Sequence, residues 1–168
     1  MEAGLVLIKN HKSTKGFSLI EMLVSLTILG ILASVAIPFA EVAVVRKKEY
    51  ELRENLRTVR EALDEFYADW QGEIISRNDE GSSRNGYPVS LSILVEGVPL
   101  KNSQDIRKYL RRIPRDPFNE DITNAEEHWA LRSSQDEPDS TLWGGEDVFD
   151  IRSKSDRVAL DGSNYRNW

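Results

Sequence analysis

Cysteine is absent from the 168-residue chain, and histidine occurs only twice. The lack of cysteine excludes a disulfide scaffold, a thiolate zinc site and a cysteine nucleophile. The sequence also lacks a phosphate-binding glycine loop and a dinucleotide-binding fingerprint. No nucleophile motif accompanies His128, which we expect to be structural or to lie at the surface. We therefore predict that the chain is not an enzyme.

Positive charge is in the minority. The chain has 22 Lys and Arg against 28 Asp and Glu, a formal net charge of −6, and a pI of about 5.1. This balance argues against binding to a phosphate backbone, so we expect no nucleic-acid partner. The mean hydropathy of −0.45 is that of an ordinary soluble protein, but the apolar residues are distributed unevenly.

Residues 22–40 form a run without a charged side chain. As a helix the run would span roughly 28 Å, close to the ~30 Å hydrocarbon core of a bilayer. Basic residues flank it at positions 9, 12 and 15 and again at positions 46–48. The positive-inside tendency places the N-terminus in the cytoplasm and exports the remainder, although the second basic group weakens that preference.

Three simpler interpretations of this run stay open. A cleaved secretory signal has an apolar stretch of only ~7–15 residues, shorter than this one. A buried core helix is possible, but rarely has so long an uncharged run. A plain single-pass anchor fits the hydropathy well.

Glu21 lies at the upstream edge of the run, next to apolar residues. An ionised group inside a bilayer costs ~2.5–3.5 kcal/mol and tends to have a functional partner, although here it could extend to the interface. Cleavage after Gly16 would leave Phe17 with a cationic amine four residues from Glu21. Because such charges attract strongly in a low dielectric, a pair between neighbouring chains would couple membrane insertion to assembly.

The stretch KGFSLIE at residues 15–21, followed by a long apolar helix, resembles the class III signal of type IV pilins and type II secretion pseudopilins. The resemblance implies cleavage after Gly16, methylation of the new Phe17 amine and a role for Glu21 in assembly. Gly30 and Pro38 also match positions of the family pattern. Since both residues weaken a helix, the resemblance implies that this stretch can lose helicity when subunits pack into a filament.

Beyond the apolar run the helical pattern continues to Trp70, with Gly72 as the expected end. Apolar residues recur at alternating steps of four and three and form one stripe, at positions 52, 56, 59, 63, 66 and 70. The spacing predicts one continuous helix over 22–70 whose second half packs on its own domain.

The remaining sequence predicts short elements. Residues 103–113 have a Ser cap and helical spacing and end at Pro114. Residues 128–133 and 147–153 are strand candidates separated by a polar loop. We expect one small sheet on the long helix. Trp168 either packs against the domain or is an exposed apolar end.

This half resembles the major, G-type pseudopilin of type II secretion. The matching pieces are Tyr87 and Pro88, the stretch YLRRIPRDPF at residues 109–118, and the Asp/Ser/Gly-rich end that finishes in Trp168. The chain departs from the family in lacking the glycine-rich tail that many members have before the final tryptophan.

The resemblance also implies a structural Ca²⁺ ion in the C-terminal loop. Asp150, Ser153, Asp156 and Asp161 are its candidate ligands. Ca²⁺ requires ~6–8 oxygen ligands, which carboxylates, backbone carbonyls and water supply. The alternative is that these residues form turns and face solvent.

The implied fold is α+β and type IV pilin-like: a long N-terminal helix, its first half membrane-spanning, packed on a small antiparallel sheet with a C-terminal loop region. The implied domains are a leader (1–16), a transmembrane and filament-core helix (17–45), and a periplasmic domain that includes the second half of the long helix (46–168).

The implied function is that of a structural subunit of a type II secretion pseudopilus, anchored by a single span in the bacterial inner membrane. The implied partners are further copies of the chain in a homopolymer, minor pseudopilins, prepilin peptidase, an inner-membrane assembly platform and the membrane itself. One alternative is a type IV pilin for adhesion, motility or DNA uptake, although many such pilins have a disulfide that this chain lacks. Another is a membrane-tethered periplasmic binding module that does not polymerise.

Overall fold

The computed structural model describes residues 16–77, 80–119 and 122–168. The chain divides into two compact units, one that ends at Val42 and one that comprises Ala43–Trp168 and is called the head below. Helix α1, Leu19–Gln71, contributes to both units. The predicted long helix is therefore confirmed. The functional boundaries expected after residues 16 and 45 stay predictions.

The C-terminus of α1 lies where Gly72 indicated. The amide of Glu73 donates to the carbonyl of Trp70 at 3.2 Å, and the amide of Ile74 donates to the carbonyl of Asp69 at 2.9 Å. Glu73 has a φ of 57°. This hydrogen-bond pair is a Schellman motif, in which Glu73 rather than a glycine takes the left-handed position.

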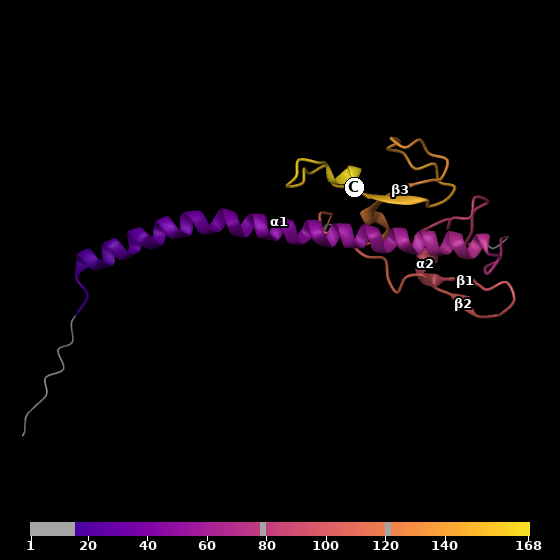
Figure 1. Cartoon of the computed structure of the whole chain (residues 1–168), viewed down its shortest axis with the longest axis horizontal. Coiled ribbons are helices and arrows are strands. Elements are labelled where there is room, and N and C mark those ends of the chain that lie inside the picture. The colour runs from indigo at the N-terminus through magenta and orange to yellow at the C-terminus, as the bar shows by residue number, and fades with distance from the viewer. Residues whose placement is uncertain (1–15, 78–79, 120–121) are drawn as a thin grey trace, which may run out of the picture. The chain divides into compact units, whose positions relative to one another are not determined.

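The other elements of the head are short. In chain order they are α2 (Ser92–Glu96), β1 (Val98–Pro99), β2 (Ile106–Arg107), η1 (Glu126–His128), β3 (Trp129–Arg132), β4 (Asp150–Ser153) and η2 (Tyr165–Asn167). Strands β1 and β2 pair antiparallel, and β3 and β4 pair antiparallel with Trp129 opposite Ser153. Figure 1 shows β3 and η2 on one side of the C-terminal half of α1 and β1 and β2 on the other.

The α+β class and the strand predictions at 128–133 and 147–153 are confirmed. Two expectations are wrong. Residues 103–113 are not a helix, because Ile106 and Arg107 pair with β1 as a strand. The single expected sheet is replaced by two sheets of two strands each.

The core of the head forms along the predicted stripe of α1. Leu52, Leu56, Val59, Leu63 and Phe66 are each at most 2% exposed. Five of the short elements contribute residues to the same core cluster, namely Leu94 of α2, Val98 of β1, Trp129 of β3, Ile151 of β4 and Tyr165 of η2. Burial of this stripe explains why the amphipathic half of α1 forms a stable helix on its domain.

Glu49 fastens the C-terminal segment to α1. Its Oε1 accepts hydrogen bonds from the Tyr165 hydroxyl at 3.0 Å and from the Leu160 amide at 2.7 Å. Burial, followed by the hydrogen bond to Glu49, raises the pKa of Tyr165 to about 12. Trp168 packs edge-on against Tyr165, and the Arg53 guanidinium lies 4.2 Å above its indole ring. Of the two alternatives for Trp168, the structure therefore shows packing on the domain.

Candidate functional site

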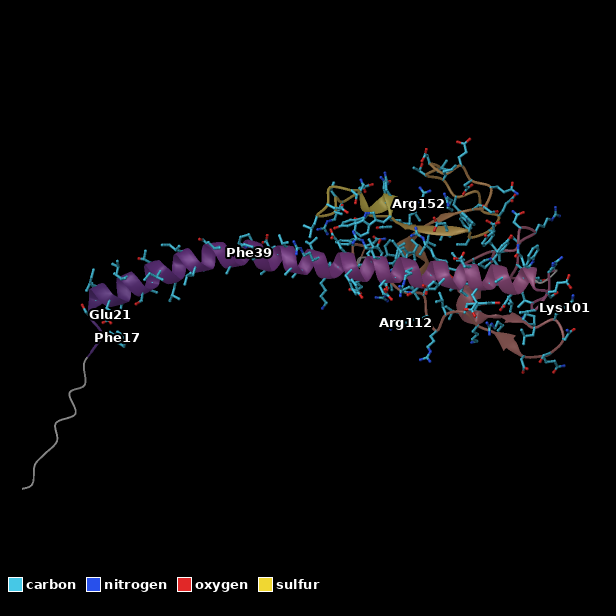
Figure 2. The ribbon with its side chains drawn as sticks, in the orientation of Figure 1. Phe17, Glu21, Phe39, Lys101, Arg112 and Arg152 are labelled. Carbon is cyan, nitrogen blue, oxygen red and sulfur yellow. The ribbon has the colours of Figure 1, made fainter. Side chains whose placement is uncertain are left out.

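The predicted processing site lies just before the first turn of α1. Gly16 and Phe17 precede the helix, and Glu21 is the acidic residue of its first turn. Figure 2 shows Phe17 and Glu21 at this end of α1. The Phe17 side chain is 79% exposed, and a Cβ at Gly16 would meet nothing within 4 Å. A peptidase therefore meets no steric obstacle from the described residues at this bond. A carboxylate in the first turn also interacts favourably with the helix dipole.

The apolar half of α1 has no partner within the described chain. No residue of its most apolar window is buried, and it is the one described helix long and apolar enough to cross a membrane. Leu19, Phe39 and Ile20 are 83, 70 and 63% exposed. A continuous exposed apolar surface of this kind marks contact with a membrane or another protein.

The hydroxyl groups in this segment bond to the helix itself. Ser25 Oγ donates to the carbonyl of Glu21 at 2.8 Å, Thr27 Oγ1 donates to that of Leu23 at 2.8 Å, and Ser34 Oγ donates to that of Ile31 at 2.7 Å. Their donors therefore need no water, which suits a lipid or protein environment.

Gly30 and Pro38 lie inside the continuous helix. A Cβ at Gly30 would meet nothing within 4 Å, so packing within the chain does not require glycine there. Pro38 has no amide hydrogen and leaves the Ser34 carbonyl without its helical donor. Glycine and proline both lower the stability of a helix locally, and the role of these two positions in assembly stays a prediction.

The four candidate Ca²⁺ ligands do not converge. Asp150 Oδ1 accepts from Arg60 Nε at 2.8 Å, and its Oδ2 lies 3.4 Å from Arg132 Nη2. Asp156 pairs with Arg166 at 2.7 Å, and Asp161 lies 3.6 Å from Arg53. The hydroxyl of Ser153 donates to buried Asp116.

Each predicted acidic ligand therefore already has an arginine partner. No group of three or more His, Cys, Asp or Glu side chains that could hold a metal occurs in residues 16–77, 80–119 and 122–168. Because Ca²⁺ requires several convergent oxygens, the residues as they lie do not fit a Ca²⁺ site.

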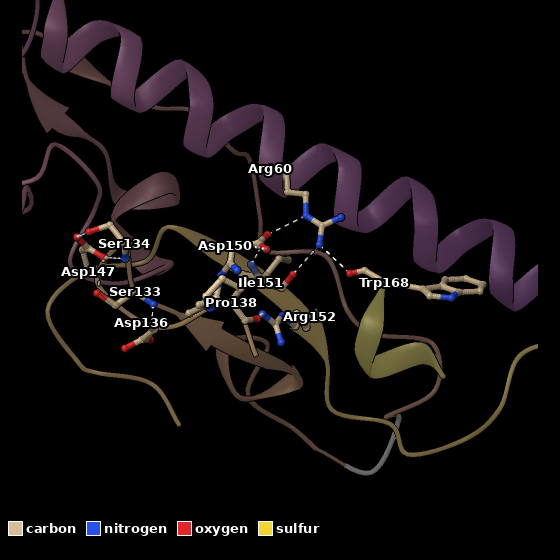
Figure 3. A network of polar contacts seen from close by, with 11 residues as sticks. Arg60, Ser133, Ser134, Asp136, Pro138, Asp147, Asp150, Ile151, Arg152 and Trp168 are labelled. Atoms are coloured by element: carbon tan, nitrogen blue, oxygen red, sulfur yellow. Dashed lines mark hydrogen bonds and ion pairs between the residues drawn. The ribbon is translucent and has the colours of Figure 1, made fainter. Parts of the chain in front are cut away.

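Arg60 joins three parts of the head at this place. Besides Asp150, its Nη2 donates to the carbonyl oxygens of Ile151 at 3.1 Å and of Trp168 at 2.8 Å (Figure 3). A single side chain of α1 thus forms hydrogen bonds both to β4 and to Trp168, the residue that follows η2. The positive charge in this region is supplied by the chain itself.

Asp147 forms a second polar centre that the sequence did not indicate. It is 0% exposed. Its Oδ1 accepts from the Ser133 hydroxyl and the Ser134 amide, both at 2.8 Å, and its Oδ2 accepts from the Ser134 hydroxyl at 2.7 Å (Figure 3). Asn85 Nδ2 donates to the same Oδ2 at 3.3 Å.

The donors around Asp147 are neutral, yet they stabilise its charge. Burial acts to raise the pKa of Asp147, but the hydrogen bonds from Ser134, Ser133 and Asn85 together outweigh it and hold the pKa below the usual 3.8. The partners lie up to 64 residues away in the sequence, since Ser83 Oγ also donates to Oδ2 at 3.4 Å, so no local spacing could have revealed this centre.

His128 has no catalytic setting among the described residues. It is 0% exposed, and neither ring nitrogen has a hydrogen-bond partner there. A general base needs a substrate within reach and is usually oriented by a third group. Of the two expectations for His128, a structural role or a place at the surface, its burial agrees with the structural role.

Comparison with known proteins places the processing site in context. Residues 11–37 match the family model described as the prokaryotic N-terminal methylation motif. Over 82 residues the chain is 37% identical to the type IV major pilin protein PilA of Myxococcus xanthus (strain DK1622). The aligned stretch covers 45% of this chain and 37% of that relative. The match thus spans well under half of the relative's length. Comparison with solved structures found no significant match.

The motif and the relative support the type IV pilin-like superfamily, and the long apolar helix with its small antiparallel sheets is consistent with a type IV pilin-like fold. The matched motif includes Gly16, Phe17, Glu21 and Gly30. Similarity to a pilin-like structural family suggests a non-enzymatic protein. The motif and the apolar helix also indicate a single-pass membrane anchor.

Proposed function

We propose that the chain is a filament subunit that prepilin peptidase cleaves after Gly16 and methylates on Phe17. One observation carries this proposal: the methylation motif, residues 11–37, extends into an apolar helix with no buried residue in its most apolar window. Before assembly the helix anchors the subunit in the inner membrane, with the head in the periplasm. After extraction by an assembly platform, neighbouring helices replace lipid as its apolar surroundings.

Glu21 has a specific part in this scheme. After cleavage, the amine of Phe17 and the carboxylate of Glu21 are the charged groups at the membrane end of the helix. Pairing of Glu21 with the amine of an incoming neighbour removes an unpaired charge from a low-dielectric environment. Assembly is therefore favoured over separate subunits in the membrane.

Within this class we favour a type II secretion pseudopilus, which would also contain minor pseudopilins. The support is the stretch YLRRIPRDPF at residues 109–118, which resembles the G-type pseudopilins, and the absence of cysteine. A second candidate is a type IV pilus, and the similarity to a type IV major pilin favours it. Expression in a secretion mutant and in a pilus mutant separates the two by which defect the chain corrects.

Substitution of Glu21 tests the filament proposal. We expect Glu21→Ala to reach the membrane and be cleaved normally, but to form at least about tenfold less filament, because one charged pair is lost at every interface. Glu41→Ala is the matched control, since it removes an exposed carboxylate of the same helix. A membrane-tethered binding module would tolerate both changes, and equal filament yields from the two variants would contradict the proposal.

A further inference from the structure

Three arginines line a groove in the head. Arg111, Arg112 and Arg115 are exposed and follow β2. Together with residues of α1, α2 and the turn at η1 they surround a groove of about 750 Å³, in which Ile113 and Pro114 supply apolar surface. A groove that combines guanidinium groups with an apolar surface suits an acidic polypeptide segment.

These arginines are unpaired within the described part of the chain. None forms an ion pair there, although Glu51, Glu96 and Glu126 also line the groove. Other arginines of the head do have carboxylate partners, such as Arg107 with Asp69 at 3.1 Å. The guanidinium groups of Arg111, Arg112 and Arg115 therefore remain available to donate hydrogen bonds to carboxylates of another molecule.

The connection between β3 and β4 has the complementary character. Glu137, Asp139 and Glu146 are exposed, and none forms an ion pair among the described residues. Leu142, in the same loop, is 80% exposed. The loop therefore presents three carboxylates and the apolar side chains of Leu142 and Trp143 to solvent.

This loop is held in shape before any partner binds. Asp136 Oδ2 accepts from the amides of Ser133 at 2.7 Å and Gly144 at 3.2 Å, and Asp147 fixes the loop ends. Preorganised loops lose less conformational entropy on binding.

The loop and the groove lie on opposite sides of α1. Figure 2 shows Arg112 on one side of the helix and Arg152 on the other. Arg152 Nη2 donates to the carbonyl of Pro138 and so marks the position of the acidic loop. One head therefore presents the two surfaces in different directions. Contacts between unlike surfaces of identical subunits form rings or open filaments.

We infer that the acidic loop of one copy, residues 137–146, docks in the arginine groove of a second copy. Carboxylates of the loop pair with Arg111, Arg112 and Arg115, and Leu142 packs on Ile113 and Pro114. The inference rests on the proposed function, because it names the contact between heads in the polymer.

Chemical cross-linking tests the contact in the full-length chain expressed with its assembly system. The absence of native cysteine makes any linkage specific to the introduced pair. A copy with Arg112→Cys and a differently tagged copy with Glu137→Cys should join through a short bismaleimide. Arg157→Cys is the matched control, because Arg157 is another exposed arginine without an ion pair in the described residues and lines neither the groove nor the pocket beside Glu146.

Charge reversal provides the second measurement. Arg112→Glu and Glu137→Arg should each lower filament yield about tenfold, since like charges then face each other. The double variant should restore the yield, whereas Arg157→Glu should leave it unchanged. A filament yield that is independent of Arg112→Glu and of Glu137→Arg would overturn the inference.

A cysteine pair in the apolar helix separates the two proposals. If Leu32→Cys copies link to one another but the groove and loop pair does not, the inference is wrong and the filament proposal stands. If neither cysteine pair links, the inference and the filament proposal are both wrong. Loss of binding to phosphatidylglycerol vesicles in Arg112→Glu, with filament yield unchanged, would assign the groove to lipid and overturn the inference.

Discussion

Arg60 of α1 donates from Nε to Oδ1 of Asp150 in β4 across 2.8 Å, although 90 residues separate them in the sequence. The same guanidinium also donates to the carbonyl oxygens of Ile151 and Trp168. A side chain of the long helix thus joins the strand and the C-terminal segment, where the sequence led us to expect a metal ion.

Loss of Arg60 should destabilise the head. We expect Arg60→Ala to lower the free energy of unfolding by about 2 kcal/mol, because charge-assisted hydrogen bonds are lost and Asp150 retains only Arg132 as an ion-pair partner among the described residues. Denaturant unfolding of the full chain in detergent micelles measures this change. Arg57→Ala is the control: its pairs with Glu54 and Glu61 are exposed, so it should cost at most about 0.5 kcal/mol. Equal losses in both variants would contradict a structural role for Arg60.

Calcium should have little effect on stability. Asp150, Asp156 and Asp161 already face arginines, so a Ca²⁺ ion would have to displace these partners. We expect the melting temperature to be the same in millimolar Ca²⁺ and in a chelator. A rise with Ca²⁺ that Asp150→Ala abolishes would instead restore the family-based calcium site.

Acid should weaken the centre at Asp147. The pKa of this carboxyl is lower in the folded chain than its usual 3.8. Its contribution to stability is therefore present in full above pH 3.8 and is lost as the pH falls through the lower folded-state pKa. Unfolding measured between neutral and strongly acidic pH should show this loss in the parent.

Asp147→Asn should remove that part of the pH dependence. The amide group would face donors already in place, so we also expect a loss of about 2–3 kcal/mol at neutral pH. Asp139→Asn, at an exposed position of the same loop, should retain the parent profile. If Asp147→Asn has the acid sensitivity of the parent, the assignment is wrong.

Gly86 should tolerate no side chain. It has a φ of +89°, and a Cβ there would lie 2.6 Å from Trp70 Cε3. Gly145 has a φ of +79° but would meet nothing within 4 Å. We expect Gly86→Ala to cost about 3 kcal/mol, from backbone strain together with overpacking. Gly145→Ala should cost about 1 kcal/mol from strain alone. The difference between the two losses of stability measures the effect of the close approach of Trp70 to Gly86. Equal losses would show that this contact is unimportant.

Features with a local period could be predicted from the sequence. The stripe from Leu52 to Phe66 repeats every three or four residues, and Gly72 marks the end of α1. Alternation likewise located β4. The processing motif is contiguous, so a short stretch was enough to identify it.

Features that depend on distant partners could not be predicted. Ile106 has helical spacing to Tyr109 and Leu110, but it is 60% exposed and pairs with Pro99 in a strand. The short helix α2 has no side-chain hydrogen bond at its N-cap, so no capping signal marks it. The spacing of the acidic residues near the C-terminus resembled a Ca²⁺ loop, but it could not show that arginines from α1 and β3 would face Asp150.

The N-terminus of the membrane-bound chain tests the central claim most directly. Mass spectrometry of the protein from a membrane fraction identifies its first residue and any modification. A filament subunit of the proposed kind should begin with N-methylated Phe17 when the peptidase is present, and should retain the residues before Phe17 when the peptidase is deleted. An unmethylated chain that still contains residues before Phe17 in peptidase-positive cells would contradict the account.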